Sequence, residues 1–256
     1  MMSLTAGRDS RMLLACARGL CSQIQFFTWG LPDATARVDL KVAKILTKRY
    51  GLRHKVYRFR EATGEDKAEW LYRTGCAVGE PRGMSLVTTN KQMTHRFYLP
   101  GLGSEVGRAF YWKISDRADT RLSAEELVAR LHHPILPRLV EHAASWLDAA
   151  PAKNTFEILD LLYIEQRLGC WAGVTDLGRA EGPLRLPPFY NRRIFALLLG
   201  LPPDYRVNQK LATDLIRGSA WPELLDIAPF NPKAKDIRSR LRPFLRKMPL
   251  LWRLLR

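Results

Sequence analysis

The first residues with clear chemical potential form a short polar segment, Thr5-Ala-Gly-Arg-Asp-Ser10. Gly7 lets the backbone approach an anion closely, and Asp9 offers a carboxylate, the ligand type that Mg²⁺ prefers. Thr5 and Ser10 add hydroxyl groups. Residues 10–20 continue with a helical pattern, and the free N–H groups and positive dipole at a helix N-terminus attract anions. The segment therefore predicts a phosphate-binding loop; an ordinary helix N-cap is the alternative, because the same residue types occur there.

Alternating strands and helices follow this loop. Residues 23–29 are rich in aromatic and β-branched side chains and stop at Gly-Leu-Pro, which predicts a strand. Residues 37–50 carry apolar side chains at helical spacing before Gly51, and residues 54–59 alternate like a strand. The alternation predicts an α/β fold with a parallel twisted sheet and helices on both faces. Ligands of such sheets bind where strands end, and the polar loop follows a very short first strand over residues 1–4.

A second glycine loop follows a later strand. Residues 65–75 are predicted to be helical, and residues 96–99 form a predicted strand that leads into Pro100-Gly-Leu-Gly-Ser-Glu105. Beyond this loop the pattern is mainly helical, with a capping box starting at Ser123 and an amphipathic helix over residues 156–171.

These patterns divide the chain into two parts. We predict a nucleotide-binding α/β part over residues 1–122 and a helical part over residues 123–256. The very short first strand leads us to expect that it is truncated and that sequence is missing upstream. The basic and apolar tail over residues 244–256 predicts a packed terminal helix, with a membrane-surface or partner-binding helix as the alternative.

The composition is that of a basic globular protein. The 256 residues include 41 Lys and Arg against 25 Asp and Glu, a net charge of +16, which suits phosphate-bearing partners without establishing nucleic-acid binding. The four cysteines form no C-x-x-C pair, so we expect no zinc site. No secretion signal and no transmembrane segment is recognisable, so we expect a cytoplasmic protein.

The loops and strands resemble, in order, the ATP-pyrophosphatase (PP-loop) domain of asparagine synthetases, which also occurs in β-lactam synthetases and lasso-peptide cyclases. The family's Ser-Gly-Gly-x-Asp-Ser loop is matched by residues 5–10, and its Phe-x-x-Gly strand end by residues 27–30. Its Gly-x-x-His step is matched by residues 51–54, and its Gly-x-Gly-Ser-Asp-Glu loop by residues 101–105. Later segments with a similar match are Leu186-Pro-Pro-Phe189 and residues 201–217.

The resemblance implies an adenine nucleotide α-hydrolase-like fold and an ATP-dependent, amide-forming ligase. In the family, a substrate carboxylate attacks the α-phosphorus of ATP, pyrophosphate leaves, and ammonia or an amine displaces AMP. The implied cofactors are ATP and Mg²⁺, with Mg²⁺ bound by Asp9 and Glu105. The residues implied to bind the nucleotide are Leu4, Thr5, Ala6, Gly7, Arg8, Asp9, Ser10, Trp29, Gly30, Gly101 and Ser104.

The implied catalytic residues are Asp9, Lys210 and Arg217. Lys210 is a stand-in, because Thr213 occupies the place of the lysine that usually stabilises the leaving pyrophosphate. Leu102 occupies the place of an acid that asparagine synthetases use near the attacking nitrogen, and leucine cannot move a proton. Ala6 replaces a loop glycine and Glu105 an aspartate. We therefore expect a carboxylate other than aspartate, with nitrogen from ammonia, from an amine or from a separate glutaminase domain or subunit.

Two other functions stay open. A tRNA-modifying PP-loop ATPase would suit the basic charge, although nucleic acid is not the partner we expect. A catalytically inactive scaffold would suit Leu102 and Thr213.

Several side chains have two interpretations. Trp29 is either a core aromatic or an adenine contact. Arg8 and Arg11 either contact phosphate or are solvated at the helix start, and Glu165 and Arg167 either face an acceptor pocket or lie on the surface.

Overall fold

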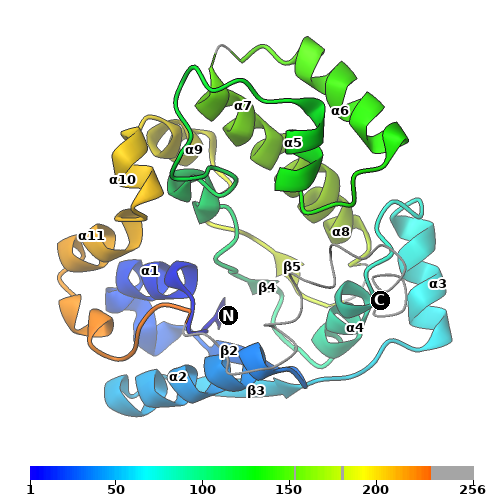
Figure 1. Ribbon diagram of the computed structural model, residues 1–256. Coiled ribbons are helices and arrows are strands. Elements are labelled where there is room, and N and C mark those ends of the chain that lie inside the picture. Colours follow the sequence, from blue (N-terminus) through cyan, green and yellow to red (C-terminus); the bar gives the residue numbers. More distant parts are fainter. Residues whose placement is uncertain (153, 180–181, 232–256) are drawn as a thin grey trace.

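The computed structural model describes residues 1–152, 154–179 and 182–231, and it has an α/β fold (Figure 1). The strands are β1 (Met2–Ser3), β2 (Phe26–Gly30), β3 (His54–Arg58), β4 (Phe97–Tyr98) and β5 (Leu184–Arg185). The α-helices are α1 (Arg8–Cys16), α2 (Ala34–Tyr50), α3 (Gly64–Arg73), α4 (Pro81–Asn90), α5 (Ala124–Arg130), α6 (Pro137–Ala149), α7 (Thr155–Leu162), α8 (Val174–Leu177), α9 (Arg192–Leu199), α10 (Pro203–Val207) and α11 (Leu211–Gly218). Shorter or irregular helices are η1 (Arg18–Gln23), η2 (Ser104–Arg108), η3 (Tyr163–Gly173) and η4 (Pro222–Leu225).

All strand pairs within the described residues are parallel. One sheet has the order β1-β2-β3, and a second sheet pairs β4 with β5. The segment after β4 also runs beside β1, because the Ser3 N–H donates to the Leu99 carbonyl at 3.1 Å and the Leu99 N–H donates to the Met1 carbonyl at 2.9 Å. The strands that precede the two glycine loops are therefore neighbours.

Local signals fix several helix ends, and two of them, Gly51 and Ser123, were predicted from the sequence. Asp33 caps α2 by accepting a hydrogen bond from the Ala36 N–H at 2.8 Å, and Gly51 ends the helix at a φ of 61°. Ser123 accepts from the Glu126 N–H at the start of α5. The predicted strand over residues 54–59 is β3, which ends at Arg58.

Other elements differ from the prediction. The first helix was expected over residues 10–20, but α1 ends at Cys16 and the 3₁₀ helix η1 follows. The amphipathic helix expected over residues 156–171 is α7 followed by the π-helix η3. Helix α4, which begins at Pro81, has no counterpart in the prediction. The tail over residues 244–256 lies outside the described residues.

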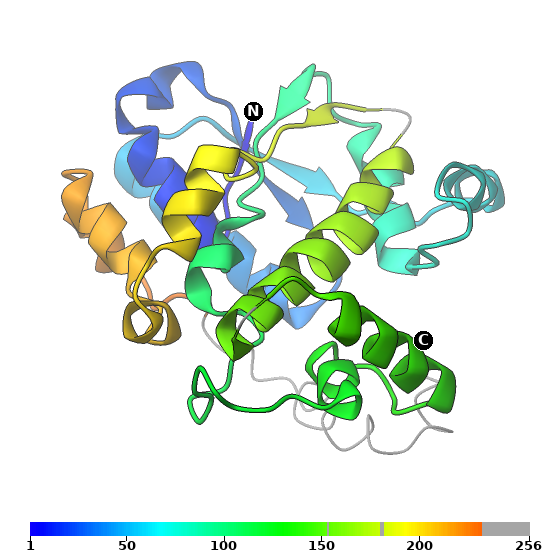
Figure 2. The same ribbon diagram turned by 90° about the horizontal axis from the view of Figure 1, so that it is seen from above.

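Two main apolar clusters join segments that are far apart in sequence. One packs α1, β1, β2 and α2 against Phe189, α11 and η4. The other packs the region after the second glycine loop against α5, α7, η3 and α9. Figure 2, seen from above, places the helices of residues 124–149 away from the strands. Helix α11 and Ile194 of α9 pack in the first of these two clusters and complete the core around the first glycine loop.

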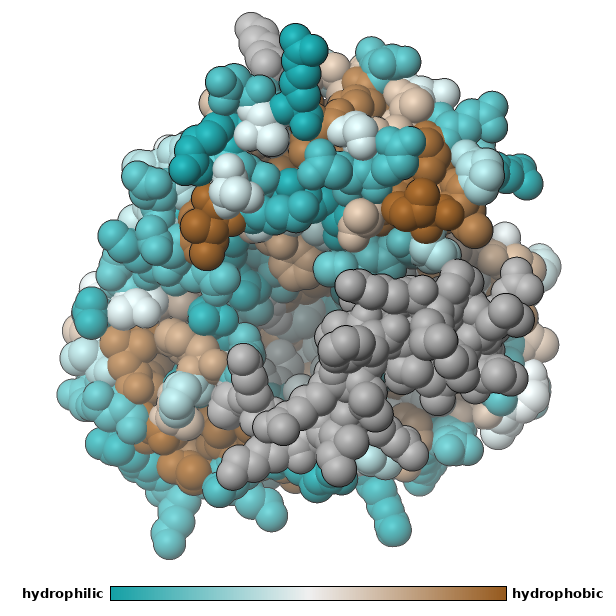
Figure 3. Space-filling view, in the orientation of Figure 1, coloured by the Kyte–Doolittle hydropathy of each residue, from teal (hydrophilic) through white to brown (hydrophobic). Residues whose placement is uncertain are grey.

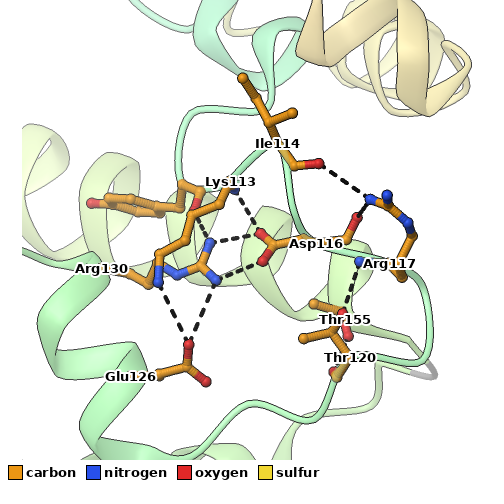
Figure 4. A network of polar contacts seen from close by, with 9 residues as sticks. Lys113, Ile114, Asp116, Arg117, Thr120, Glu126, Arg130 and Thr155 are labelled. Atoms are coloured by element: carbon orange, nitrogen blue, oxygen red, sulfur yellow. Dashed lines mark hydrogen bonds and ion pairs between the residues drawn. The ribbon is translucent and has the colours of Figure 1, made fainter.

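A buried ion pair holds the segment between the second glycine loop and α5 in place (Figure 4). Arg130 donates to both carboxylate oxygens of Asp116 at 2.7 and 2.8 Å and to the Tyr111 carbonyl at 2.6 Å. The two side chains are 5% and 3% exposed. Burial acts to raise the pKa of Asp116, but hydrogen bonds from Arg130 and from the Lys113 N–H outweigh it and hold the pKa below its ordinary value.

We expect Arg130→Met to lower the free energy of unfolding by about 3–5 kcal/mol, because it leaves the Asp116 carboxylate buried without its partner. Lys113→Met is the matched control, since the Lys113 side chain is 57% exposed and lies 3.6 Å from Glu126. That control is expected to cost about 1 kcal/mol or less. Urea denaturation of both variants measures the difference, and equal losses would contradict the assignment.

Candidate functional site

The two glycine loops, nearly a hundred residues apart, meet at the ends of the neighbouring strands. A Cβ atom on Gly101 would lie 2.5 Å from the Asp9 Cβ and 3.2 Å from the Ser10 nitrogen, so only glycine allows this approach. The Ser104 hydroxyl donates a hydrogen bond to Asp9 across the junction. Thus the structure brings together the loop residues that the sequence predicted.

Arg108 connects the carboxylates of the two loops. Its Nη2 atom lies 3.1 and 3.2 Å from the two oxygens of Asp9 and 3.2 Å from Oε1 of Glu105. The Gly103 N–H donates to the other Glu105 oxygen at 3.0 Å. The side chain of Arg108 is 12% exposed. This residue was not predicted from the sequence, where its one signal is its place three residues after Glu105.

Burial and charge perturb this cluster strongly. Burial raises the pKa of Asp9 to about 6, the Glu105 charge adds to the rise, and Arg108 and Ser104 oppose it. Burial also raises the pKa of Tyr163, and the charge of Glu105 adds to the rise. Perturbed ionisable groups of this kind are typical of functional sites, although structural ion pairs also produce them.

The first glycine loop closes on itself before α1 begins. The Thr5 N–H donates to the Ser10 hydroxyl at 3.1 Å, and the Gly7 N–H donates to the Thr5 hydroxyl at 3.1 Å. The Ala6 N–H donates to Asp39 on α2 at 2.8 Å, a partner that the sequence did not indicate. Gly7 is the N-cap residue and no side chain caps α1. Therefore the first turn of α1, rather than the loop amides before it, offers N–H groups to an anion.

Arg11 has a structural role that neither sequence interpretation foresaw. Its guanidinium is buried and donates to the carbonyls of Ala228, Ala6 and Pro229. It also lies 4.8 Å from the centre of the Phe230 ring. Arg11 therefore anchors residues 228–230 onto the first loop and, being buried, is not available to bind a ligand.

Beside Arg108 lies a hollow of about 390 Å³. It is lined by Arg8, Arg108, Ala109, Phe110, Trp112, Ile114, Val207 and Gln209. Arg8 makes no ion pair with a described residue, and the buried Nε of Arg108 has no hydrogen-bond partner among them. Two guanidinium groups with unused donors favour an anionic ligand here. Hydrophilic residues also cover much of the face seen in Figure 3.

The predicted adenine contacts are engaged within the sheet. The Leu4 N–H donates to the Phe27 carbonyl, and its carbonyl accepts from the Thr28 hydroxyl at 2.6 Å. Trp29 packs edge-on against Phe27, and its indole N–H donates to Asn90 at 2.9 Å. Gly30 pairs with β3 at the end of β2. The geometry of Trp29 favours the core interpretation.

The candidate catalytic residues of α11 are separated. Lys210 is exposed at the N-terminus of the helix, next to Gln209, which lines the hollow. Arg217 is exposed in its last turn and pairs with Asp214 at 3.8 Å. Neither Arg217 nor Lys210 has a contact with Asp9 among the hydrogen bonds and ion pairs of the described residues, and only Lys210 adjoins a residue that lines the hollow.

Arg167 and Glu165 point to different environments. Glu165 is exposed and accepts a hydrogen bond from the Trp146 indole at 2.7 Å. The guanidinium carbon of Arg167 lies 3.8 Å from the centre of the Trp171 ring, and its charge acts to lower the pKa of Tyr163 and of Tyr190. The surface interpretation therefore suits Glu165 and not Arg167.

Tyr190 lies against the second glycine loop. Burial raises its pKa to about 12, and its hydroxyl has no hydrogen-bond partner among the described residues. Leu102 in the same loop packs against the second apolar cluster.

The carboxylates do not fit a protein-bound Mg²⁺ as they stand. Arg108 and the Gly103 N–H already bind the oxygens that a bridging cation would need. Among the described residues, no group of three or more His, Cys, Asp or Glu side chains is placed to hold a metal. A metal ion between Asp9 and Glu105 would have to displace Arg108.

Comparisons with known proteins add no assignment. No family model matches the chain, and no curated protein matches it significantly. Of the helices described, none is both long and apolar enough to cross a membrane.

We expect Gly101→Ala to push the two loops apart and to lower the free energy of unfolding by about 1–3 kcal/mol. Gly64→Ala is the matched control, because a Cβ there would meet no atom within 4 Å. Thermal and urea unfolding compare the two variants. A Gly101→Ala variant as stable as the control would show that the loops do not touch.

Asp9 makes stability depend on pH in a defined direction. Its folded-state pKa of about 6 lies above the unfolded value, so its contribution to stability is full below pH 4 and is lost as pH rises through 6. Asp9→Asn removes this dependence. The variant should therefore gain on the order of 2 kcal/mol relative to the wild type between pH 4 and pH 7, measured by urea unfolding. A constant difference would mean that Arg108 and Ser104 cancel the effect of burial, and a relative loss by the variant would mean that they outweigh it.

Proposed function

We propose that this chain is an ATP-dependent ligase that resembles the synthetase domain of asparagine synthetases. The observation that supports it most is the junction of the two glycine loops, with Gly101 against Asp9 at the ends of neighbouring parallel strands. A nucleotide bound at such strand ends would lie beside the start of α1. The proposed reaction adenylates a small carboxylate, releases pyrophosphate and forms an amide with ammonia or an amine.

The residues present suit charge neutralisation more than proton transfer. The uncapped first turn of α1, Arg8 and Arg108 would bind phosphate oxygens, and the Ser10 hydroxyl would keep the loop in its closed form. Leu102 supplies no acid or base. Mg²⁺ enters this proposal as the counter-ion that ATP carries, with no protein carboxylate assigned to it.

The acceptor side of the proposed reaction would lie towards η3. Tyr163 and Tyr190 lie beside the second glycine loop on that side, and charges of both signs act on them: Glu105 and Asp176 against Arg167 and Arg185. The two arginines are the groups there that would attract a carboxylate substrate. A separate glutaminase domain or subunit would be one source of nitrogen.

The finer structural predictions belong to the same proposal. They are the adenine nucleotide α-hydrolase-like arrangement with helices on both sheet faces, the boundary between residues 122 and 123, and a cytoplasmic location. Nucleic acid is not among the proposed partners, since the proposed tRNA-modifying activity has only the net charge in its favour.

A catalytically inactive scaffold is the second candidate. Two observations favour it: the apolar packing of Leu102, and the hydrogen bonds that engage both backbone groups of Leu4, one to the Phe27 carbonyl and one from the Thr28 hydroxyl. Such a protein would keep the fold of the loops without turning over ATP.

We expect the purified chain, given ATP, Mg²⁺ and a panel of amino acids and dicarboxylic acids, to release AMP and pyrophosphate with at least one acid. Ser10→Ala should reduce this release at least tenfold, because it removes the hydroxyl that holds the Thr5 amide. Ser219→Ala is the matched control, since its hydroxyl bonds only to its own helix within the described residues. Release of ADP and phosphate would contradict the mechanism, and calorimetry without heat at millimolar ATP would favour the scaffold.

A further inference from the structure

The carboxylates of Asp9 and Glu105, one from each glycine loop, accept hydrogen bonds from groups of the protein itself. Asp9 accepts from the Ser104 hydroxyl and from Arg108, and Glu105 accepts from Arg108 and from the Gly103 N–H. Arg108 therefore stands between the two carboxylates, where a bridging cation would stand.

The backbone holds Arg108 in this position. It is the last residue of the 3₁₀ helix η2, whose flanking residues Gly103 and Ala109 have φ values of 102° and 51°. A positive φ at a buried alanine is uncommon and costs free energy, so the surrounding packing must enforce it. A Cβ on Gly103 would also lie 2.8 Å from the Tyr190 ring. The position of Arg108 is thus built into the loop.

Arg108 has binding capacity to spare. Its Nη2 contacts both carboxylates, no hydrogen bond joins its Nη1 to a described residue, and the side chain lines the hollow that Arg8 also lines. A guanidinium keeps its charge at all physiological pH values and binds phosphate oxygens in a fixed planar geometry. It can bind carboxylates on one side and a phosphate on the other.

We propose that Arg108 takes the place of a protein-bound divalent cation, so that the hollow binds a phosphate or pyrophosphate group without metal. The pair of Asp9 and Glu105 is then a latent metal site that opens when Arg108 is removed. The metal half of this proposal does not depend on the proposed ligase function. The anion half rests on that function and adds the group that the hollow binds.

The metal half is tested with Mn²⁺ alone, by electron paramagnetic resonance titration of the full chain. Wild-type protein should bind Mn²⁺ weakly, and Arg108→Met should bind it at least tenfold more tightly. Arg108→Lys keeps a cation between the carboxylates and should resemble the wild type. Arg73→Met, an exposed arginine paired with Glu69, is the matched control and should change nothing.

Two results would overturn the metal half. One is tight Mn²⁺ binding to wild-type protein that Glu105→Gln abolishes. The other is a folded Arg108→Met variant, checked by circular dichroism, with the weak binding of the wild type. Tight binding to Arg108→Met that the added change Glu105→Gln removes would assign the new site to this carboxylate pair.

The anion half is tested with inorganic pyrophosphate in EDTA, by calorimetry. Wild-type protein should bind it, and Arg108→Met should bind it at least tenfold more weakly, whereas Arg73→Met should bind as the wild type does. Pyrophosphate that binds only with added metal, or not at all, would overturn this half. Metal-free pyrophosphate binding in a chain that never cleaves ATP would instead refute the ligase and leave the anion site standing.

Discussion

The parallel pairing of the chain's first residues with the segment after β4 is the constraint on which the rest of the site depends. Two backbone hydrogen bonds, between Ser3 and Leu99 and between Leu99 and Met1, make these strands neighbours. Each strand then delivers its loop to the same edge. Neighbouring strands lie only about 4.8 Å apart, so the two loops that follow them come very close. At the point of contact there is no room for a side chain, and Gly101 occupies that point. Charges placed on the two loops are consequently forced together.

The sequence predicted the elements whose signals are local. Helical spacing and Gly51 predicted α2 and its end, alternation predicted β3, and Ser123 starts α5 as expected, whereas the Asp33 cap, which lies before the predicted start of α2, was not predicted. Helix α4 was missed because its interior holds small and polar residues, which are buried here by neighbours that the sequence does not show. The two glycine loops were recognisable, since their residues carry the conformational requirement themselves.

The partners of charged residues were not predictable in the same way. Arg11 and Arg108 both follow a glycine loop and look like surface arginines in the sequence, yet one is buried under a late segment and the other bridges two carboxylates. Their roles depend on residues more than ninety positions away or on the path of a 3₁₀ turn. Periodicity describes which face of an element is apolar, but it holds no information about which distant charge will lie opposite. Trp29 shows the same limit for an aromatic side chain.

The anchoring by Arg11 has a consequence for the order of folding. The first loop is synthesised before its partners, because its strand pairs with residues near 99 and the guanidinium of Arg11 binds the carbonyls of Ala228 and Pro229. Contacts between such distant segments form slowly, because a long chain must close first. The nascent chain would therefore hold the first loop unfinished until Pro229 has been made, so the loop is completed long after its own residues are synthesised.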